Sequence, residues 1–494
     1  MGLIGKSASS AMVGLDIGSE LIKVAEARLA RDGIQITGLG ISPTPAGTVD
    51  NSIAVDPQAL GAAIKQLLRD SGIKARQVVS SVSGQSSVVV RVIEVPKMTR
   101  EELAETMKWE VERHVPFAPT EIVMDFAPIE KPNTPPDAQN MEVLLAVAQQ
   151  DAINSHVRTL LAAGLEPVAI DVQPLAVSRS LINVVDGAQP QTVAAINIGA
   201  TTTDFGIFEA GLLTFPGPPI PIAGINFTRA ISEGLGVSME EAERLKKEYA
   251  AADMSAAGGG PSDTAYDIGA PPAAVEPASF DTSVPQAGSD FSPFDFGGAP
   301  PPPPPKKEEA LNISGEEVFD LGGGQEVRDF KPEFDLDEPE PGAEQPAPGF
   351  DLETEGERGA GPAGPEHLPP PAAAAPEAEK APVAAPADGQ DVRRSVINAV
   401  APVLMELATE IRRSLDYYST RYQNRPEQIF LCGGTAKMHD LDKFLASELG
   451  IPAQVADPIA NLIVDCPKYS PQYLSEVSPL FPVSIGLAIR EMLE

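Results

Sequence analysis

The sequence is poor in cysteine, tryptophan, cationic side chains and long apolar runs. Its two cysteines, Cys432 and Cys466, are too few for a disulfide framework, which favours a reducing, cytosolic compartment. No stretch of eighteen apolar residues occurs, and the first twelve residues hold one lysine and no apolar core, so we expect neither a membrane span nor a secretory signal. The 36 Lys and Arg against 70 Asp and Glu give a net charge of −34, which argues against nucleic-acid binding as the main role.

Half of the prolines and most of the net charge lie in one segment, residues 251–390. It holds 25 of the 50 prolines, and its 28 Asp and Glu against 6 Lys and Arg contribute −22 of the −34. Such a segment buries too little apolar surface to offset the entropy lost on ordering it. We therefore predict a long disordered insertion at 251–390, and a short flexible N-terminus at 1–11, in an otherwise folded protein.

Four short elements recur in this acidic segment, each with Phe-Asp followed by phenylalanine or leucine. The last three are spaced by 15 and 16 residues. Weak sites that repeat along one chain gain affinity together, so the elements suit a multivalent docking tether for an unknown ligand. The alternative is that acidic sequence of this kind produces such triplets by chance. The four elements are Phe294-Asp295-Phe296, Phe319-Asp320-Leu321, Phe334-Asp335-Leu336 and Phe350-Asp351-Leu352.

The remaining sequence alternates between strand and helix patterns, which indicates the α/β class. It opens with three strands predicted between Met12 and Ile41, joined by tight glycine-containing turns. An apolar stripe of helical period predicts a long helix from Val392 to Tyr422, which Pro402 should kink or restart.

A helix with a capping box carries the only tryptophan of the chain. Thr99 is the predicted N-cap, with Glu102 reaching back to its amide. Trp109 lies off the apolar stripe of this helix, among glutamates that include Glu112. Two interpretations stay open. Either Trp109 packs under a neighbouring loop, or Trp109 and Glu112 help to form a partner-binding groove.

A strand, a glycine and a hydroxyl-bearing turn follow one another in VGLDIGSELIK (13–23). Donors from Gly18 and Ser19 would hold phosphate oxygens, with Lys23 as a charge partner. Asp16 would position magnesium through water, because Mg²⁺ keeps much of its hydration shell, and it is the one catalytic candidate. An ordinary hairpin with a glycine turn would look the same, so this stretch alone is a weak signal.

The stretch INIGATTTDFG (196–206) repeats the arrangement about 180 residues later. Two such turns in one chain favour phosphate binding far more strongly than either does alone. The candidate residues of this second turn are Asn197, Gly199, Thr201, Thr202 and Thr203.

Two later segments complete the candidate site. In SMEEAERLKKEY (238–249), three charged residues on adjacent helical turns either contact the ribose and adenine of a nucleotide or form a solvated ion-paired face. In IFLCGGTAKM (429–438), a glycine pair would let the backbone approach a flat base closely. The candidates are Glu243, Lys246 and Lys247 in the first segment and Gly433, Gly434 and Thr435 in the second.

These strings together resemble the PilM family, the actin-like proteins of type IV pilus machines, which is itself similar to the cell-division protein FtsA. The resemblance rests on LDIGSELIKVAE, RVIEVPKMTREELAETMKWEVERHVPF, AAINIGATTTDFGIF, GVSMEEAERLKKEY and IFLCGGTAKMHDLDKFLASELGIPAQVADP, and it runs through almost all of the sequence outside the acidic segment. It implies an actin-like two-lobed ATPase fold, with ATP and Mg²⁺ between the lobes and a small extra subdomain of the 1C type. The implied ranges are 12–82 and 166–190 for lobe 1, 83–165 for subdomain 1C, and 191–250 and 391–494 for lobe 2.

The resemblance also implies partners. The short N-terminal cytoplasmic peptide of a PilN-like membrane protein would bind in a groove near the extra subdomain. Through PilN and PilO, the protein would be cytoplasmic and peripheral to the inner membrane, and it would connect to the pilus motor ATPases.

One residue departs from the pattern of actin-like ATPases. They usually carry Asp where this chain has Asn197, and an amide supplies neither negative charge nor a base. We therefore expect ATP to be bound but hydrolysed slowly or not at all. Two rival functions stay open: an FtsA-like, filament-forming membrane scaffold, and a phosphotransferase of the sugar-kinase class, for which Asp171 could serve as the base.

Overall fold

The structure is a computed structural model of the chain. It describes residues 11–84, 86–118, 121–131, 135, 137–182, 192–252 and 389–493, and all of these belong to the first of two units in the chain. The predicted insertion lies outside the described residues except at its ends. There Ala251 and Ala252 still belong to the fold, and Gly389 begins a helix. The predicted N-terminal segment also lies outside, apart from residue 11.

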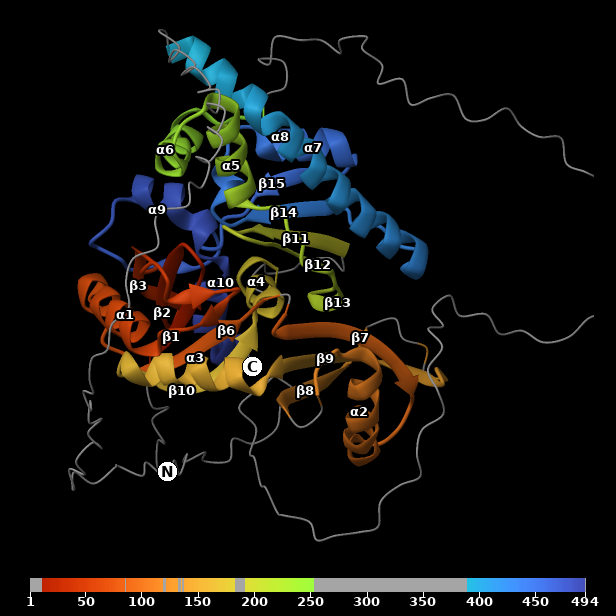
Figure 1. Cartoon of the computed structure of the whole chain (residues 1–494). Coiled ribbons are helices and arrows are strands. Elements are labelled where there is room, and N and C mark those ends of the chain that lie inside the picture. The colour runs from red at the N-terminus through yellow and green to blue at the C-terminus, as the bar shows by residue number, and fades with distance from the viewer. Residues whose placement is uncertain are drawn as a thin grey trace, which may run out of the picture. The chain divides into compact units, whose positions relative to one another are not determined.

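The first sheet has six strands in the order β10-β6-β1-β2-β3-β16 (Figure 1). The predicted opening strands are confirmed as β1, β2 and β3, which pair antiparallel, while β6 and β10 extend the sheet in parallel from β1. The bounds are Met12–Ile17 for β1, Leu21–Ala30 for β2, Gly33–Pro43 for β3, Gln77–Val82 for β6, Glu166–Val172 for β10 and Ile463–Val464 for β16.

Helices cover both faces of the first sheet. One face packs against α1 and α3, and the other against α4 and α10. The side chains of β1 alternate accordingly, with Val13 and Leu15 facing α1. On the opposite face, a Cβ on Gly14 would lie 1.9 Å from the Ser484 carbonyl oxygen of α10, so only glycine allows this close approach. The bounds are Pro57–Ser71 for α1, Gln150–Ala162 for α3, Gln173–Leu181 for α4 and Pro482–Ala488 for α10.

The position of the C-terminal segment corrects one predicted domain boundary. We assigned 391–494 as a whole to lobe 2, but β16 pairs with β3 and α10 packs on β1 and β2 of the first sheet. The short helices α9 (Pro471–Val477) and α11 (Arg490–Leu493) accompany this return of the chain. The apolar run in VSIGLAI predicts burial, but it does not say against which sheet.

The second sheet repeats the topology of the first, in the order β13-β12-β11-β14-β15. Strands β11, β12 and β13 pair antiparallel, and β14 and β15 extend the sheet in parallel from β11, as β6 and β10 do from β1. The β1–β2 and β11–β12 turns therefore occupy equivalent positions in two similar sheets. The bounds are Thr192–Ile198 for β11, Thr203–Glu209 for β12, Leu212–Pro216 for β13, Gln428–Cys432 for β14 and Ala453–Val455 for β15.

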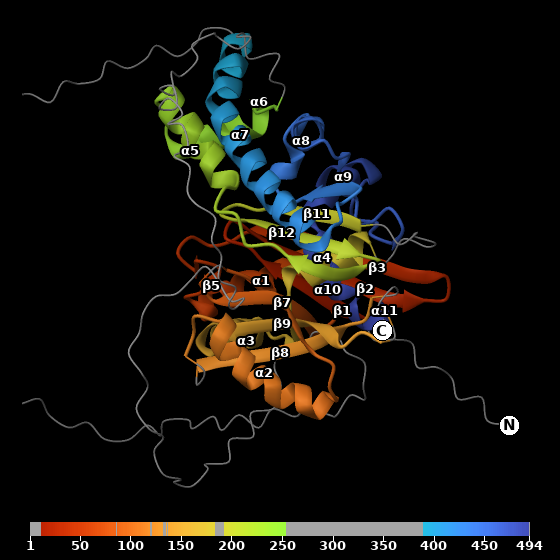
Figure 2. The ribbon, with the colours of Figure 1, turned by 90° about the vertical axis from the view of Figure 1, so that its right-hand side faces the viewer.

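Four helices pack with the second sheet around one apolar core. Helix α7 runs beside α5 and α6 (Figures 1 and 2), and its predicted stripe from Val396 to Tyr418 is buried. The sequence predicts a kink or a restart at Pro402; a restart is excluded because α7 continues through Pro402, and the kink stays a prediction. The bounds are Gly224–Leu235 for α5, Met239–Tyr249 for α6, Gly389–Tyr422 for α7 and Leu441–Leu449 for α8.

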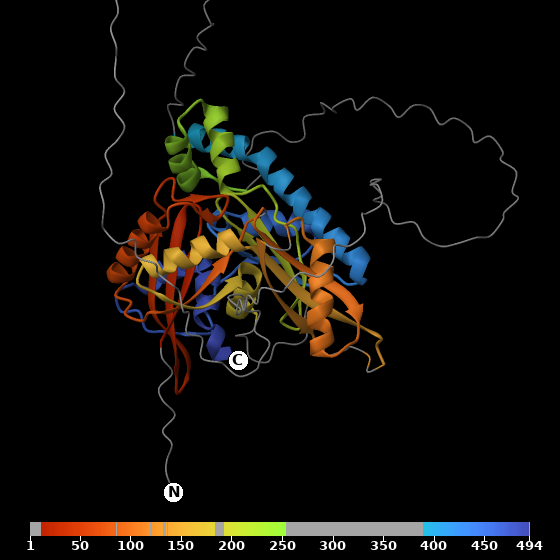
Figure 3. The same ribbon diagram turned by 60° about the horizontal axis from the view of Figure 1, so that its bottom comes forward.

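A small third sheet, in the order β7-β9-β8, packs against helix α2 (Figure 3). The predicted capping box is confirmed, since Thr99 and Glu102 exchange both hydrogen bonds at the start of α2. The predicted subdomain, 83–165, is larger than this unit because α3 packs on α1 and shares the core of the first sheet. The bounds are Val88–Pro96 for β7, Arg100–His114 for α2, Ile122–Ile129 for β8 and Asn140–Gln149 for β9, and a minor hairpin joins β4 (Val49–Asp50) and β5 (Ile53–Ala54).

Trp109 lies on the outer side of α2 with 69% of its surface exposed. The interpretation that it packs under a neighbouring loop is therefore wrong. Among the described helices, none combines the length and apolar character needed to cross a membrane.

Candidate functional site

The structure brings the two predicted phosphate-binding turns together. In the first turn the Gly18 amide donates to the Leu21 carbonyl oxygen at 3.0 Å, and in the second the Gly199 amide donates to the Thr202 carbonyl oxygen at 3.0 Å. The tips meet where the hydroxyl oxygens of Ser19 and Thr201 lie 3.1 Å apart, although 182 residues separate them in sequence. Two hairpins of identical design thus face each other across the junction of the two sheets.

Asp16 is buried at the end of β1 beside the first turn, with 3% of its surface exposed. Its carboxylate forms an ion pair with Lys23 at 2.6 Å, because the two residues are register partners across the β1–β2 hairpin. The side-chain amide of Gln173, at the start of α4, lies 3.5 Å from the other carboxylate oxygen. Lys23, which was predicted to pair with the phosphate charge, is thus paired with Asp16 in this structure.

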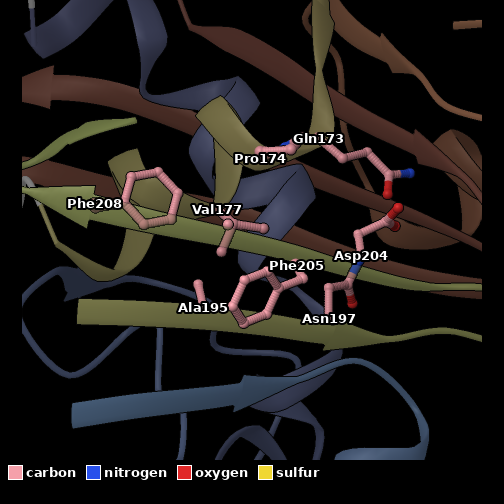
Figure 4. A pocket seen from close by; sticks show the side chains of 9 residues that line it. Gln173, Pro174, Val177, Ala195, Asn197, Asp204, Phe205 and Phe208 are labelled. Carbon is pink, nitrogen blue, oxygen red and sulfur yellow. The ribbon is translucent and has the colours of Figure 1, made fainter. Parts of the chain in front are cut away.

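Asn197 and Asp204 occupy the corresponding positions in the second hairpin, as register partners on β11 and β12. Both line a small cavity of about 10 Å³, where their side chains and that of Gln173 lie at one end, with Phe205 and other apolar side chains behind them (Figure 4). Burial, and next the negative charge of Asp16, raise the pKa of Asp204 to about 6. The site therefore holds a second carboxylate close to the first.

Asp204 is the residue that sequence reasoning missed. The signal was present as spacing: Asp16 and Lys23 are seven residues apart around Gly18, and Asn197 and Asp204 are seven apart around Gly199. In an antiparallel hairpin with the same turn, that spacing makes residues register partners. Position 204 is thus the equivalent of position 23, with a carboxylate in place of an ammonium group.

The three threonines of the second turn have different environments. Thr201 is exposed at the tip, and Thr202 contributes its carbonyl oxygen to the turn. Thr203 is fully buried in β12, and its hydroxyl donates to the Ile222 carbonyl oxygen at 2.7 Å. Thr203 therefore stabilises the sheet in this structure, and its hydroxyl does not point into the junction.

The glycine pair after β14 also divides into two roles. Gly433 has a φ of +89°, and a Cβ there would lie 2.4 Å from the Ile198 carbonyl oxygen, so the β11 backbone requires a glycine. A Cβ on Gly434 would meet nothing within 3.9 Å, which leaves this residue as the candidate for close approach to a base. The Thr435 hydroxyl lies 3.5 Å from the Gly199 carbonyl oxygen and so belongs to the junction.

Glu243 and Lys246 link α6 to the start of α5. The Lys246 ammonium group lies 2.6 Å from Glu243 and donates to the Gly224 carbonyl oxygen at 3.0 Å, while Lys247 is exposed and pairs with Glu243 at 3.2 Å. The Gly224 amide in turn donates to the Gly199 carbonyl oxygen at 3.0 Å. The predicted ion pairs are present, and they connect to the second turn through α5; contact with a nucleotide stays a prediction.

Asp171 is unsuited to the role of a catalytic base. Its side chain is fully buried, forms an ion pair with Arg179 and lies 3.8 Å from Arg490. A fully buried carboxylate that lies between two guanidinium groups is not accessible to a substrate. This weakens the rival interpretation of a sugar-kinase-like phosphotransferase.

The side chains at the junction fit a magnesium ion. Mg²⁺ is usually bound in proteins by one or two carboxylates together with waters and phosphates. Asp16 and Asp204 supply two carboxylates, and Asn197 and Gln173 add amide oxygens, all from elements that converge here. Within the described ranges, no group of three or more His, Cys, Asp and Glu side chains forms a metal site by itself. Phosphate oxygens and water would have to complete the coordination.

Comparisons with known proteins agree with this geometry. The family model described as type IV pilus assembly protein PilM matches residues 14–254, and the model for cell division protein FtsA matches residues 194–475. Cell division protein FtsA of Bacillus subtilis (strain 168) is 27% identical over 256 residues, which is 48% of this chain. The chain spans 57% of the length of that curated relative.

A solved structure, the PilM-PilN type IV pilus biogenesis complex, is similar over 97% of this chain and 98% of that one, with a TM-score of 0.63 and 22% identity. This likeness shows the fold. The ethanolamine utilization protein EutJ from Carboxydothermus hydrogenoformans is also similar, with a TM-score of 0.43 and 12% identity over 99% of this chain and 91% of that one. The chain therefore has the actin-like ATPase fold. It belongs to the actin-like family of the FtsA model, which matches more than half of it, and it is a PilM-like protein of that kind.

Proposed function

We propose that this protein is an ATP-binding adaptor of a type IV pilus-like assembly at the inner membrane. The observation that carries the proposal is the junction of the two equivalent glycine turns, where Ser19 and Thr201 are 3.1 Å apart and two carboxylates lie close behind them. Turns of this kind present backbone amides and hydroxyls to phosphate oxygens, and bound magnesium would neutralise charge between the carboxylates and the phosphates. ATP and Mg²⁺ would hold the two lobes in one relative position.

The test for nucleotide binding is titration of the purified full-length protein with ATP, with and without Mg²⁺. Thr201→Val removes a turn hydroxyl at constant shape and should weaken binding. Thr409→Val is the matched control, because Thr409 lies exposed on α7 and its hydroxyl donates to the Met405 carbonyl oxygen of the same helix. Equal loss of affinity in both variants, or tight binding that no change at Thr201 or Asp16 affects, would contradict the proposed site.

Hydrolysis in this site would be slow or absent. Asn197 supplies no charge, and Asp16 is held by Lys23. Asp204 is the carboxylate placed to compensate, although it comes from the opposite strand of the hairpin. Single-turnover hydrolysis by purified protein should be far slower than about one per second, the low end of ordinary enzyme turnover. A rate near that value that is lost in Asp16→Ala would sink this part of the proposal.

The partner would be the N-terminal peptide of a PilN-like membrane protein, through which this chain would be peripheral to the inner membrane. The solved complex that resembles this chain contains PilM and PilN, which supports this choice. A pull-down with that peptide, with and without ATP, is the direct test. Trp109→Ala and Glu112→Gln should weaken capture, whereas Tyr473→Ala should not, although Tyr473 is also exposed. If none of these variants changed the amount of captured protein, the peptide would bind at a site other than α2. Contacts with pilus motor ATPases can be tested by the same assay.

A second candidate is an FtsA-like scaffold that forms filaments. The match of the FtsA model to residues 194–475 favours it. Such a protein should sediment as polymer in the presence of ATP and bind vesicles without a partner. An adaptor should remain in the supernatant under the same conditions.

The acidic insertion would be dispensable for both binding reactions. Ala251 pairs with His439, and the Ala252 amide donates to the His439 carbonyl oxygen at 2.8 Å, so the second lobe is complete where the insertion leaves it. Deleting residues 255–388 should therefore preserve folding, ATP binding and peptide capture. An unfolded product would refute this view of the insertion.

A further inference from the structure

A pocket separate from the nucleotide junction lies at the edge of the first sheet. It has a volume of about 270 Å³ and is formed by the end of β3, by α1 and by the loop that follows β16. The chain closes it with Tyr469, whose hydroxyl donates to the Leu39 carbonyl oxygen at 3.0 Å and whose ring stacks on Tyr473. The wall that Tyr469 forms is thereby held in place.

The pocket combines apolar walls with hydrogen-bond donors. Its apolar lining comes from Ile41, Pro43, Ala63, Leu67 and Tyr469. The hydroxyl oxygen of Ser42 is buried there and has no hydrogen-bond partner within the described part of the chain. A buried hydroxyl without a partner costs free energy, so a group that accepts a hydrogen bond is expected beside it.

Cationic side chains lie at the rim of this pocket. Lys468 lines it and donates to the Asp70 backbone carbonyl oxygen, and Arg69 donates to the lining residue Gln66. The one acidic side chain of the lining, Asp70, already accepts a hydrogen bond from Gln66 at 2.8 Å. An occupant should therefore offer an apolar group for the walls and a carboxylate for Lys468 and Ser42.

The acidic segment of this chain offers that combination in four elements. Each element places a phenylalanine directly before an aspartate and adds a second apolar residue after it, which is leucine in three elements and phenylalanine in one. The segment carries 28 acidic against 6 basic residues, so its charge is opposite to that of the pocket rim. The 66 residues between Ala252 and Phe319 can extend to about 220 Å, which is ample to reach another face of the same protein.

We propose that this pocket receives the Phe-Asp-Leu elements of the chain's own insertion, one at a time. The phenylalanine ring would contact the apolar walls, and the aspartate would accept hydrogen bonds from Lys468 and Ser42. Several weak elements that compete for one pocket keep it filled through their high local concentration. An external ligand of the same elements would have to displace them from the first lobe.

Carbodiimide coupling of the full-length protein, followed by mass spectrometry, tests the proposal. The reagent joins an amine to a carboxylate in contact, so Lys468 should couple to Asp295, Asp320, Asp335 or Asp351. Changing the phenylalanine of all four elements to alanine keeps every charge and should reduce this coupling at least tenfold. Phe330→Ala is the matched control and should leave the coupling unchanged, because Phe330 follows Asp329 and precedes a lysine, and so lacks the Phe-Asp-Leu order.

A second pair of variants tests the pocket itself. Ala63→Phe fills it and should abolish the coupling, whereas Ala62→Phe, on the exposed side of α1, should not. Unaltered melting temperatures would show that both variants fold. Equal coupling of Lys468 to acidic residues outside the elements, or coupling that Ala63→Phe leaves intact, would overturn the proposal. Mixing isotopically heavy and light protein distinguishes the chain's own insertion from that of a second copy, and exclusively mixed cross-links would also overturn it.

Discussion

Two ionisable groups behind the junction, one fully and one partly buried, should have opposite effects on the pH dependence of stability. The first is His156 on α3, whose Nε2 lies 2.9 Å from the Ser80 hydroxyl, which itself donates to the Leu15 carbonyl oxygen next to Asp16. Burial lowers the pKa of His156 to about 4 from 6.5. Between these values the unfolded chain binds a proton that the folded protein does not bind. Acidification through this window therefore lowers the free energy of unfolding, by about 3 kcal/mol in total.

The second group, Asp204, has the opposite sign. Its pKa is raised from 3.8 to about 6, so within this window the folded protein binds a proton that the unfolded chain has released. Its contribution to stability is present below about pH 4 and is lost as the pH rises through about 6. The loss is at most about 3 kcal/mol, and solvent screening reduces it because Asp204 is only partly buried. The two groups should therefore nearly cancel between pH 4 and 6.5.

Asp204→Asn exposes this cancellation. The variant should be more stable than the wild type at pH 8, by up to about 3 kcal/mol, and its stability should fall more steeply as the pH is lowered to 4.5. Urea unfolding of both proteins across this pH range measures the difference in the free energy of unfolding. The other carboxylates are the same in both proteins, so their contribution cancels in that difference. A variant that is less stable than the wild type at pH 8, with an unchanged slope, would refute this account of Asp204.

Three further predictions concern single structural features. Gly433→Ala should cost about 2–4 kcal/mol of unfolding free energy, because φ is +89° and the new Cβ would overlap the Ile198 carbonyl oxygen of β11. Gly434→Ala should be nearly neutral, and chemical denaturation of both variants measures the difference. Asp171→Asn should cost about 3–5 kcal/mol of unfolding free energy, since it removes the buried carboxylate that pairs with Arg179 and lies beside Arg490, and an unchanged melting temperature would contradict this. Lys131, after β8, lies 2.7 Å from Glu142 and 3.7 Å from Glu209 on β12. A double-mutant cycle on Lys131 and Glu209 should give a coupling of about 0.5–1 kcal/mol, and a value of zero would mean that this ion pair does not join the small sheet to the second lobe.

Much of the fold and part of the site could be predicted because the signals are local. A hairpin turn, a capping box and a helical stripe each depend on residues within one or two turns of one another. The opening strands, the start of α2 at Thr99 and the buried stripe of α7 were therefore predicted from the sequence. The meeting of the two turns was predicted from their pairing in one chain, and the 3.1 Å contact of Ser19 with Thr201 agrees with it.

The errors concern contacts between distant segments. An apolar helix such as α10 indicates that it is buried, but the choice of the first sheet depends on the close approach of Gly14 to the Ser484 carbonyl oxygen. The position of α3 on α1 follows in the same way from surfaces that meet only after folding. For Trp109 the error was in the burial itself: one interpretation placed this large aromatic side chain under a loop, but it is exposed. The hydrophobicity of a segment alone does not determine which surface of the protein it packs against.

The equivalence of the two hairpins changes the meaning of Asn197. Taken alone, an amide at the start of the second turn removes a charge from the nucleotide site. Register shows that the same hairpin carries a carboxylate seven residues later, on the facing strand, where the first hairpin carries the ammonium group of Lys23. The junction therefore retains two carboxylates, but both the charge of Asp16 and the burial of Asp204 raise the cost of keeping them ionised together. A bound cation lowers that cost, so the arrangement favours holding a magnesium–nucleotide complex, and Asp204 is the group through which any hydrolysis would have to be assisted.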